Sequence, residues 1–384
     1  MTIASMQPMN GQALTRKIRV LIVDDSAVIR GLVTRWLENE ADIEIAGVAV
    51  NGKEGADQAD RLKPDIVILD IEMPVMDGVT ALPAIRKNAP HARVIMASTL
   101  TQRGAEITIK ALSAGASDYI PKPDANHLAG ADAYKRDLVN KIRVLGARAL
   151  KARAGSPSLD TSGPPPFRPL PNAQNTSNSS SIRLRAPSTK VNPEAIFIGS
   201  STGGPEALRV VIAGLVGKIQ VPVFITQHMP PLFTKILAEH LSKQTKASVV
   251  EASDGQQVQP GVFYIAPGDR HMTVTRNLKV TRISLNANPP ENFCRPSVDP
   301  MLRSAEESYG DRAMVVILTG MGQDGLLGCK PLVAKGAHLI AQDEDSSVVW
   351  GMPGAVARAG LATSCKPLDE IAPAILSALR GVFV

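Results

Sequence analysis

Aromatic side chains are scarce in this chain, since phenylalanine, tryptophan and tyrosine together make up 3% of its 384 residues. Proteins that bind single-stranded nucleic acid stack bases on such side chains, so the composition argues against that class. No apolar run is long enough to span a membrane, and the N-terminal MTIASMQPMNGQALTRK lacks the apolar stretch of a secretion signal. We therefore expect a cytoplasmic protein.

Cysteine is scarce as well. The chain has only Cys294, Cys329 and Cys365, which are far apart, odd in number and match no metal-binding spacing. A reducing compartment is the simplest explanation, in agreement with a cytoplasmic location.

An excess of basic charge is concentrated in one segment. The formal net charge is +6, but residues 125–190 hold eleven Lys or Arg against three Asp or Glu, a local excess of +8. The rest of the chain is therefore slightly acidic, at −2. We attribute the basic charge to a linker rather than to a folded face, and expect no nucleic-acid partner.

The length suits two domains, and strands alternate with helices in two separate regions. In residues 17–124, the segments after Ser26, Gly52, Gly78 and Thr101 are expected to be helical. The expected strands there are IRVLIV, IEIAGVA, DIVILD and RVIMAS, with a fifth in the segment DYIPKP. In residues 191–384 the expected strands are AIFIG, VPVFITQ, GVFYIAP, AMVVILTG and AHLIAQ, with hairpin character around 261–284.

Two segments, residues 1–16 and 125–190, lie outside the two predicted domains. Residues 1–16 are predicted to be disordered. Residues 125–190 begin with a helical pattern over about 127–152 and continue as a Pro-, Ser- and Asn-rich stretch that cannot bury enough surface to fold. The predicted fold class is thus α/β, with two doubly wound, mainly parallel sheets joined by a flexible linker. The first is flavodoxin-like and the second Rossmann-like.

Three acidic residues follow strands of the first domain. Asp24 and Asp25 end the first strand and Asp70 ends the third, so the carboxylates should meet at one edge of the sheet. Mg²⁺ would relieve their repulsion and neutralise a phosphoryl group arriving on one of them. Lys122 would add a fixed positive charge there, and Ser98 a hydroxyl.

These residues resemble the response-regulator receiver family, with MPVMDG matching its loop after the third strand. The resemblance implies phosphorylation of Asp70 by a histidine kinase, with Mg²⁺ held by Asp24, Asp25 and Asp70. It implies switch roles for Ser98, Lys122 and Tyr119. A half-buried structural aromatic is an equally good explanation of Tyr119 from sequence alone.

The turn GSSTGG (199–204) between an apolar strand and a helix could hold an anion. A P-loop would need Lys and Ser or Thr after its glycines, and a dinucleotide site would need an acid at the end of the next strand. Pro205 and Glu206 follow the glycines instead, and the next strand ends in Gln227–His228. The sequence of the turn therefore indicates a turn that presents a nucleophilic side chain, rather than a phosphate-binding or dinucleotide-binding loop.

A hydroxyl, an imidazole and a carboxylate should leave neighbouring strands at one edge of the second sheet. Ser201 would be the nucleophile, His228 its base, and Asp324, in LTGMGQDG, the residue that orients the imidazole. Backbone N–H groups of Met321 and Thr202 would hold the oxyanion. No cofactor is expected for this site.

Several alternatives stay open on the residues alone. Ser200 cannot be separated from Ser201. His271 is a rival base, whereas His240 and His338 are expected to be structural. Cys294 is a rival nucleophile that lacks a strand–turn–helix setting.

Six sequence blocks resemble the catalytic domain of the chemotaxis protein-glutamate methylesterase family. They are IGSSTGGPEAL, ITQHMPP, YIAPGDRHM, RPSVD, ILTGMGQDG and VVWGMPGAV, within about 193–380. The family's nucleophile precedes Thr-Gly-Gly, which selects Ser201 over Ser200. The resemblance implies hydrolysis of glutamate γ-methyl esters on chemoreceptors, deamidation of receptor glutamines, and a receiver that covers the hydrolase site until it is phosphorylated. Contact with the membrane would then be only through the receptors.

Overall fold

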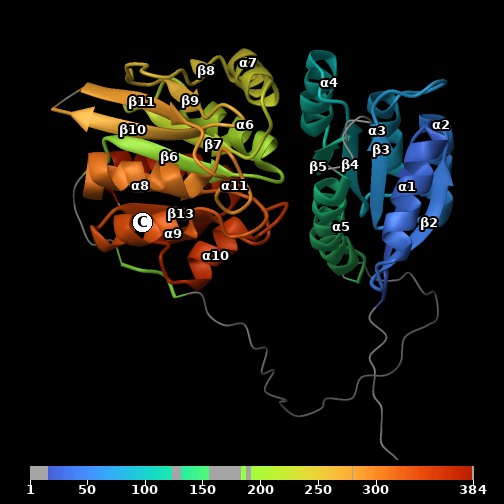
Figure 1. The fold of residues 1–384 in the computed structure, drawn as a ribbon. Coiled ribbons are helices and arrows are strands. Elements are labelled where there is room, and N and C mark those ends of the chain that lie inside the picture. The colour runs from blue at the N-terminus through green and yellow to red at the C-terminus, as the bar shows by residue number, and fades with distance from the viewer. Residues whose placement is uncertain (1–15, 123–130, 155–182, 187–191, 279, 383–384) are drawn as a thin grey trace, which may run out of the picture.

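A computed structural model describes residues 16–122, 131–154, 183–186, 192–278 and 280–382. Within these residues the chain forms two α/β units that lie side by side, each built on a parallel sheet flanked by helices (Figure 1). The predicted fold class is therefore confirmed. Most of the predicted disordered N-terminus and of the predicted Pro- and Ser-rich linker lies outside the described residues. No helix in the described part of the chain is long and apolar enough to cross a membrane.

The first sheet has five parallel strands in the order β2-β1-β3-β4-β5. This is the flavodoxin-like order, in which ligands bind beyond the carboxyl ends of the strands. Its strands are β1 (Ile18–Val23), β2 (Ile43–Ala49), β3 (Ile66–Asp70), β4 (Arg93–Ser98) and β5 (Asp118–Pro121). Its helices are α1 (Ala27–Glu38), α2 (Gly52–Leu62), α3 (Gly78–Asn88), α4 (Gln102–Ser113) and α5 (Ala131–Ala154). We call this unit the N-terminal domain.

The helix α5 packs on the first sheet and carries seven of the eleven basic residues counted above. Leu138, Ile142 and Leu145 are buried against that sheet. Several of the basic side chains form ion pairs with acidic residues of both domains. These pairs are Lys135–Glu40, Lys141–Asp118, Arg143–Asp42, Lys151–Glu344 and Arg153–Asp65. Much of the charge that the sequence attributed to a linker thus lies on a folded helix and is paired there.

The second sheet has seven strands in the order β14-β13-β12-β6-β7-β9-β8, paired in parallel. Its central strands are buried along their whole length, which explains their unbroken apolar sequences. The strands are β6 (Ala195–Ser200), β7 (Val223–Gln227), β8 (Val249–Glu251), β9 (Phe263–Ile265), β12 (Ala313–Ile317), β13 (His338–Gln342) and β14 (Ser364–Lys366). We call this unit the C-terminal domain.

An antiparallel hairpin of β10 (His271–Asn277) and β11 (Val280–Asn286) stands beside this sheet and confirms the predicted hairpin character. The helices of the C-terminal domain are α6 (Gly204–Leu215), α7 (Phe233–Thr245), α8 (Val298–Tyr309), α9 (Leu326–Ala334), α10 (Met352–Arg358) and α11 (Leu368–Leu379), with a short 3-10 helix at Gly310–Arg312. The sequence did not predict β8, β14, α10 or α11, of which the two strands have only three residues each.

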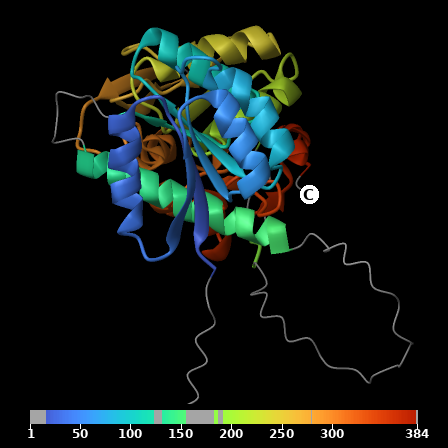
Figure 2. The same ribbon diagram turned by 90° about the vertical axis from the view of Figure 1, so that its right-hand side faces the viewer.

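The two domains meet along α4, β5 and α5, which face the C-terminal domain (Figure 1), and Figure 2 shows the N-terminal domain lying over its partner. The rings of Tyr119 on β5 and Phe233 on α7 stack with their centroids 5.1 Å apart. At the edge of the interface, Ser113 Oγ lies 3.0 Å from His240 Nε2. The carboxyl edge of β6, where the nucleophile was predicted, thus lies close to β5.

Candidate functional sites

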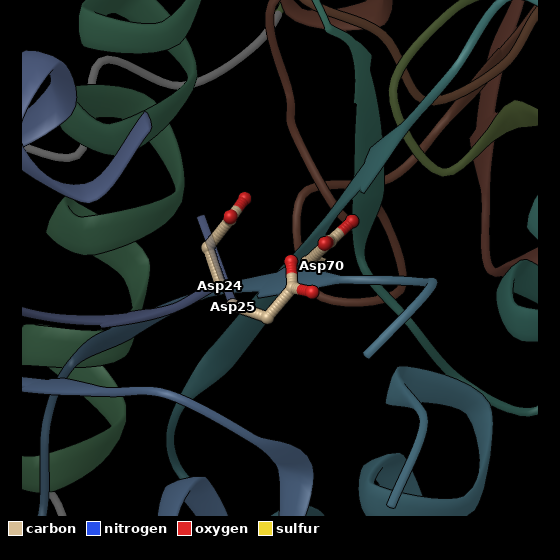
Figure 3. Close-up of side chains that lie close together, drawn as sticks. All are labelled: Asp24, Asp25 and Asp70. Atoms are coloured by element: carbon tan, nitrogen blue, oxygen red, sulfur yellow. The ribbon is translucent and has the colours of Figure 1, made fainter. Parts of the chain in front are cut away.

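The three predicted acidic residues meet at the carboxyl edge of the first sheet. Asp24 and Asp25 follow β1 and Asp70 ends β3, as Figure 3 shows, and one carboxylate oxygen from each lies within 4.8 Å of the others. Asp24 and Asp70 are buried, whereas Asp25 is exposed. The group opens into a cavity of about 130 Å³ that Ser98 and Lys122 also line.

Lys122 supplies the only ion pairs that Asp24 and Asp70 make among the described residues. Its Nζ lies 2.8 Å from Asp24 Oδ2 and 2.8 Å from Asp70 Oδ1. Burial nevertheless raises the pKa of Asp70 from its ordinary value of 3.8 to about 6, with Lys122 opposing the shift and the charge of Asp24 adding to it. One lysine therefore does not compensate for the crowded carboxylates, and hard oxygen ligands with surplus negative charge fit Mg²⁺.

The two remaining residues predicted to act as switches lie in different places. Ser98 is buried at the end of β4, lines the acidic cavity and donates a hydrogen bond to the Thr99 carbonyl at 3.2 Å. Tyr119 lies outside that cavity, in the domain interface, where burial and the nearby Asp118 and Asp137 raise its pKa well above the usual range. Tyr119 is therefore a packed interface aromatic in this conformation.

The turn after β6 separates the roles of its two serines. Ser200 is fully buried and donates to Gln227 Oε1 at 2.7 Å, and Gln227 Nε2 donates to the Ser201 carbonyl at 3.0 Å. Ser200 therefore holds the turn in place. Gly203 has a φ of 77°, and a Cβ on Gly204 would come within 1.9 Å of Gln227 Oε1, so the turn requires both glycines.

Ser201 is half-buried and lines a second cavity, of about 870 Å³, between the two domains. His228, Cys294 and Met321 line the same cavity from the C-terminal domain. Residues of β5 and α5 close it from the other side, among them Tyr119, Lys122, Tyr134 and Lys141. Ser201 and His228 thus line the same cavity.

The partly buried His228 pairs with the buried Asp324, with 2.7 Å between Nε2 and Oδ2. Asp324 also accepts hydrogen bonds from five further donors, which leaves it fully engaged. These are the Asn292 side-chain amide, the Ser297 hydroxyl and the backbone N–H groups of Val298, Asp299 and Gly325.

The donors around Asp324 set the charge states of the pair. Burial alone would raise the pKa of Asp324, but the hydrogen bonds and the charge of His228 lower it below its ordinary value. Burial would likewise lower the pKa of His228, but Cys294 and Asp324 outweigh it and raise this pKa above the ordinary value. The lowered pKa of Asp324 favours its anionic form, which can hydrogen-bond to the imidazole and stabilise its protonated form.

The hydroxyl of Ser201 and the imidazole do not form a hydrogen bond in the described structure. The remaining ring nitrogen, His228 Nδ1, lies 3.5 Å from Cys294 Sγ instead. Cys294 was predicted only as a rival nucleophile, and its contact with the imidazole could not be foreseen from its position in the sequence.

The other candidate residues have structural contacts. His271 is buried, with Nε2 3.1 Å from the Pro289 carbonyl, and Nδ1 accepts from the Ser297 N–H. His240 lies on α7 and contacts Ser113, and His338 is buried in β13. None of these three histidines lines the cavity that contains Ser201.

Both predicted oxyanion donors, Thr202 and Met321, line the same cavity as Ser201. The Ser201 N–H donates to the Thr319 carbonyl, whereas the N–H groups of Thr202 and Met321 enter no hydrogen bond found among the described residues. The Thr202 hydroxyl crosses the domain interface and donates to Asp118 Oδ2 at 2.7 Å. Asp118 also accepts from Lys141 Nζ at 2.5 Å, and the sequence gave no signal for this interdomain contact.

Comparison with known families places both halves of the chain. Residues 20–131 match the response regulator receiver domain, and residues 196–375 match the CheB methylesterase family. A protein-glutamate methylesterase/protein-glutamine glutaminase of Azospirillum brasilense is 52% identical over 365 residues, covering 93% of this chain and 92% of that protein. A protein of the same name, with the suffix 1, from Paramagnetospirillum magneticum is 50% identical over 372 residues and covers 94% of this chain and 96% of its own length.

Solved structures resemble the two domains separately. The CheB methylesterase catalytic domain of Thermotoga maritima is 39% identical, covers 49% of this chain and 99% of its own, and has a TM-score of 0.47. The response regulator domain of Thermotoga maritima CheB is 44% identical, covers 33% of this chain and 95% of its own, and has a TM-score of 0.31.

The raised pKa of Asp70 predicts a pH-dependent gain in stability on Asp70→Asn. A carboxyl whose pKa is raised on folding favours the folded state less as pH rises, here between about 4 and 6. Above pH 7, without divalent metal, the variant should be more stable by about 3 kcal/mol, since each pKa unit corresponds to about 1.4 kcal/mol. Thermal unfolding in EDTA at pH 4 and pH 8 measures this. A gain of equal size at both pH values would contradict the assignment, and Mg²⁺ should reduce the gain at pH 8.

Proposed function

This chain belongs to the CheB methylesterase family and carries a response-regulator receiver domain, and on that premise we propose that it removes methyl groups from glutamate γ-methyl esters of chemoreceptors. The observation that carries the proposal is that His228, paired with Asp324, lines one cavity with Ser201. The names of the relatives support a second reaction, deamidation of receptor glutamines.

Both reactions use the same residues. Ser201 Oγ attacks the side-chain carbonyl of the substrate, and His228 takes the hydroxyl proton at Nδ1, the nitrogen not bound to Asp324. The N–H groups of Thr202 and Met321 stabilise the oxyanion. Collapse of the tetrahedral intermediate expels methanol from an ester, or ammonia from an amide, with the proton returned by His228. Water then hydrolyses the acyl-serine by the reverse sequence.

The conformation described above, in which the N-terminal domain covers the cavity that contains Ser201, is unsuited to this chemistry; we call it the closed form. His228 Nδ1 faces Cys294 rather than Ser201, and the raised pKa of His228 favours the imidazolium, which cannot accept a proton. The N-terminal domain also covers the cavity through β5 and α5. Activation therefore requires the domains to separate, and the tether predicted between them would keep the separated domains close.

Phosphorylation of Asp70 is the proposed trigger. Asp24, Asp25 and Asp70 would hold Mg²⁺, which supplies charge neutralisation for transfer of a phosphoryl group from a histidine kinase. Lys122 and Ser98 line the same cavity as Asp70 and would contact the phosphoryl oxygens. Lys122 follows β5, the strand that carries Asp118 and Tyr119 into the interface, so a rearrangement at Lys122 can reach both interface contacts through one strand.

The proposed setting is the cytoplasm, with membrane contact only through receptors. No nucleic-acid partner is proposed, because the basic side chains of α5 are engaged in ion pairs instead of forming a free face.

The choice of nucleophile predicts opposite results for two substitutions. Ser201→Ala should lower methanol release from methylated receptor membranes by at least a thousandfold, since the nucleophile is lost. Cys294→Ala should keep turnover within about tenfold, because its thiol is not the attacking group. Release of labelled methanol by the phosphorylated proteins measures both. If Cys294→Ala were inactive and Ser201→Ala active, the thiol would be the nucleophile.

The phosphoacceptor assignment predicts that Asp70→Asn responds to no phosphodonor. Acetyl phosphate with Mg²⁺ should stimulate ester hydrolysis by the wild type and leave the rate of the variant at its basal level. The same assay run in EDTA should abolish stimulation of the wild type. Stimulation of Asp70→Asn would place the acceptor elsewhere.

The interdomain hydrogen bond predicts that Thr202→Val raises basal hydrolysis. Valine keeps the shape and the backbone N–H but cannot donate to Asp118, and hydrogen bonds to charged groups contribute about 1.5–3 kcal/mol. The rate without phosphodonor should rise several-fold, and the ratio of stimulated to basal rate should fall. Ser113→Ala, which removes the solvent-exposed interdomain contact with His240, is the matched control and should change the ratio little. An unchanged ratio in Thr202→Val would mean that this bond does not hold the closed form.

A further inference from the structure

A strained two-residue turn lies beside the candidate nucleophile. Glu291 and Cys294 pair through both backbone hydrogen bonds, at 3.1 and 2.8 Å. Between them, Asn292 and Phe293 have φ angles of 51° and 63°. Tight hairpin turns with positive φ at both central residues strongly favour Asn followed by Gly, because glycine has no Cβ to clash. Here phenylalanine occupies the position that favours glycine.

Nothing in the fold explains this phenylalanine. Its side chain is 100% exposed, although the N-terminal domain covers the neighbouring cavity. The ring therefore contributes no buried surface to either domain or to their interface, while its backbone conformation is disfavoured. A strained residue that stabilises nothing, next to a reactive group, indicates a role in function.

Two residues of the turn, Asn292 and Cys294, contact the pair formed by Asp324 and His228. Asn292 Nδ2 donates to Asp324 Oδ1 at 2.9 Å and to Asp299 Oδ2 at 2.9 Å. Cys294 Sγ contacts His228 Nδ1, and Glu291 makes a two-point ion pair with Arg303. Phe293 is thus held in a set position relative to His228 and Asp324, on the lining of the cavity that contains Ser201.

We propose that Phe293 is a substrate-positioning residue, whose ring packs on apolar side chains of the receptor helix beside the esterified glutamate. This rests on the proposed function. Only the ester-bearing arm of a macromolecular substrate can enter the cavity, so the rim must contact the surface around that arm. A rigid aromatic ring provides a large contact area with little loss of conformational entropy, as at the centres of protein interfaces.

Another residue in the chain provides a matched control. Leu278, between β10 and β11, is 98% exposed and has a φ of 55°, but it does not line the cavity. Glycine at either position removes an exposed apolar side chain and relieves the same backbone strain. Phe293→Gly and Leu278→Gly should therefore both fold, with thermal midpoints equal to or above that of the wild type.

The test compares two substrates with the full-length proteins under acetyl phosphate and Mg²⁺. One substrate is methylated receptor membranes, and the other is the γ-methyl ester of N-acetylglutamate methylamide, which has no helix surface. We expect Phe293→Gly to raise the KM for receptor about tenfold with kcat within twofold, and to leave kcat/KM for the small ester unchanged. Phe293→Tyr should restore the KM, and Leu278→Gly should match the wild type on both substrates.

Three results would overturn the proposal. The first is an unchanged KM of Phe293→Gly for the receptor. The second is an equal loss of kcat/KM on the small ester, which would make the turn only a support for His228. The third is a changed ratio of stimulated to basal rate in Phe293→Gly, which would assign the ring to domain closure. If the wild type hydrolysed the small ester through Ser201 but not the receptor ester, the proposed function would itself be wrong, and this outcome is distinct from the other three.

Discussion

The buried carboxylate of Asp324 is the interaction on which the C-terminal site depends. Its donors come from the starts of α8 and α9, from the turn at 291–294 and from β7 by way of His228. A charge with so many donors tolerates burial, and each donor is in turn held in place by the charge. The same residue thus organises the local fold and forms a hydrogen bond with the imidazole, so a structural role of Asp324 and its proposed catalytic role do not compete.

The strand β5 links the two sites. Its first two residues meet the C-terminal domain, Asp118 at Thr202 and Tyr119 at Phe233, and Lys122 follows its end at the acidic cluster. Lys122 lines both the acidic cavity and the larger interdomain cavity. Asp70, the proposed phosphoacceptor, and Ser201, the proposed nucleophile, are therefore linked through one strand, and no long pathway through the core is needed to connect them.

Much of this arrangement could be predicted from the sequence, because it depends on which residues stand at the ends of strands. Parallel strands bring their carboxyl ends to one edge, which is why Asp24, Asp25 and Asp70 could be placed together from the sequence, and likewise the strands ending near Ser201 and His228. Contacts between domains gave no such signal, because they depend on the relative placement of two separate sheets. The bond from Thr202 to Asp118 belongs to this class. The helix α5 was recognised as a helix, yet its charge was assigned to a linker, since ion pairs with distant residues cannot be read from local composition.

The placement of one cavity between the domains has a consequence for the kinase reaction. The N-terminal domain covers the cavity that contains Ser201. Binding of a substrate in that cavity and the proposed phosphorylation of Asp70 would therefore both disfavour the arrangement in which the two domains are in contact. Thermodynamic linkage is reciprocal: if phosphorylation increases affinity for the receptor by some factor, bound receptor must favour the phosphorylated state by the same factor. An abundance of methylated receptor would then draw phosphoryl groups toward this protein, so the substrate itself would take part in setting how much of the enzyme is active.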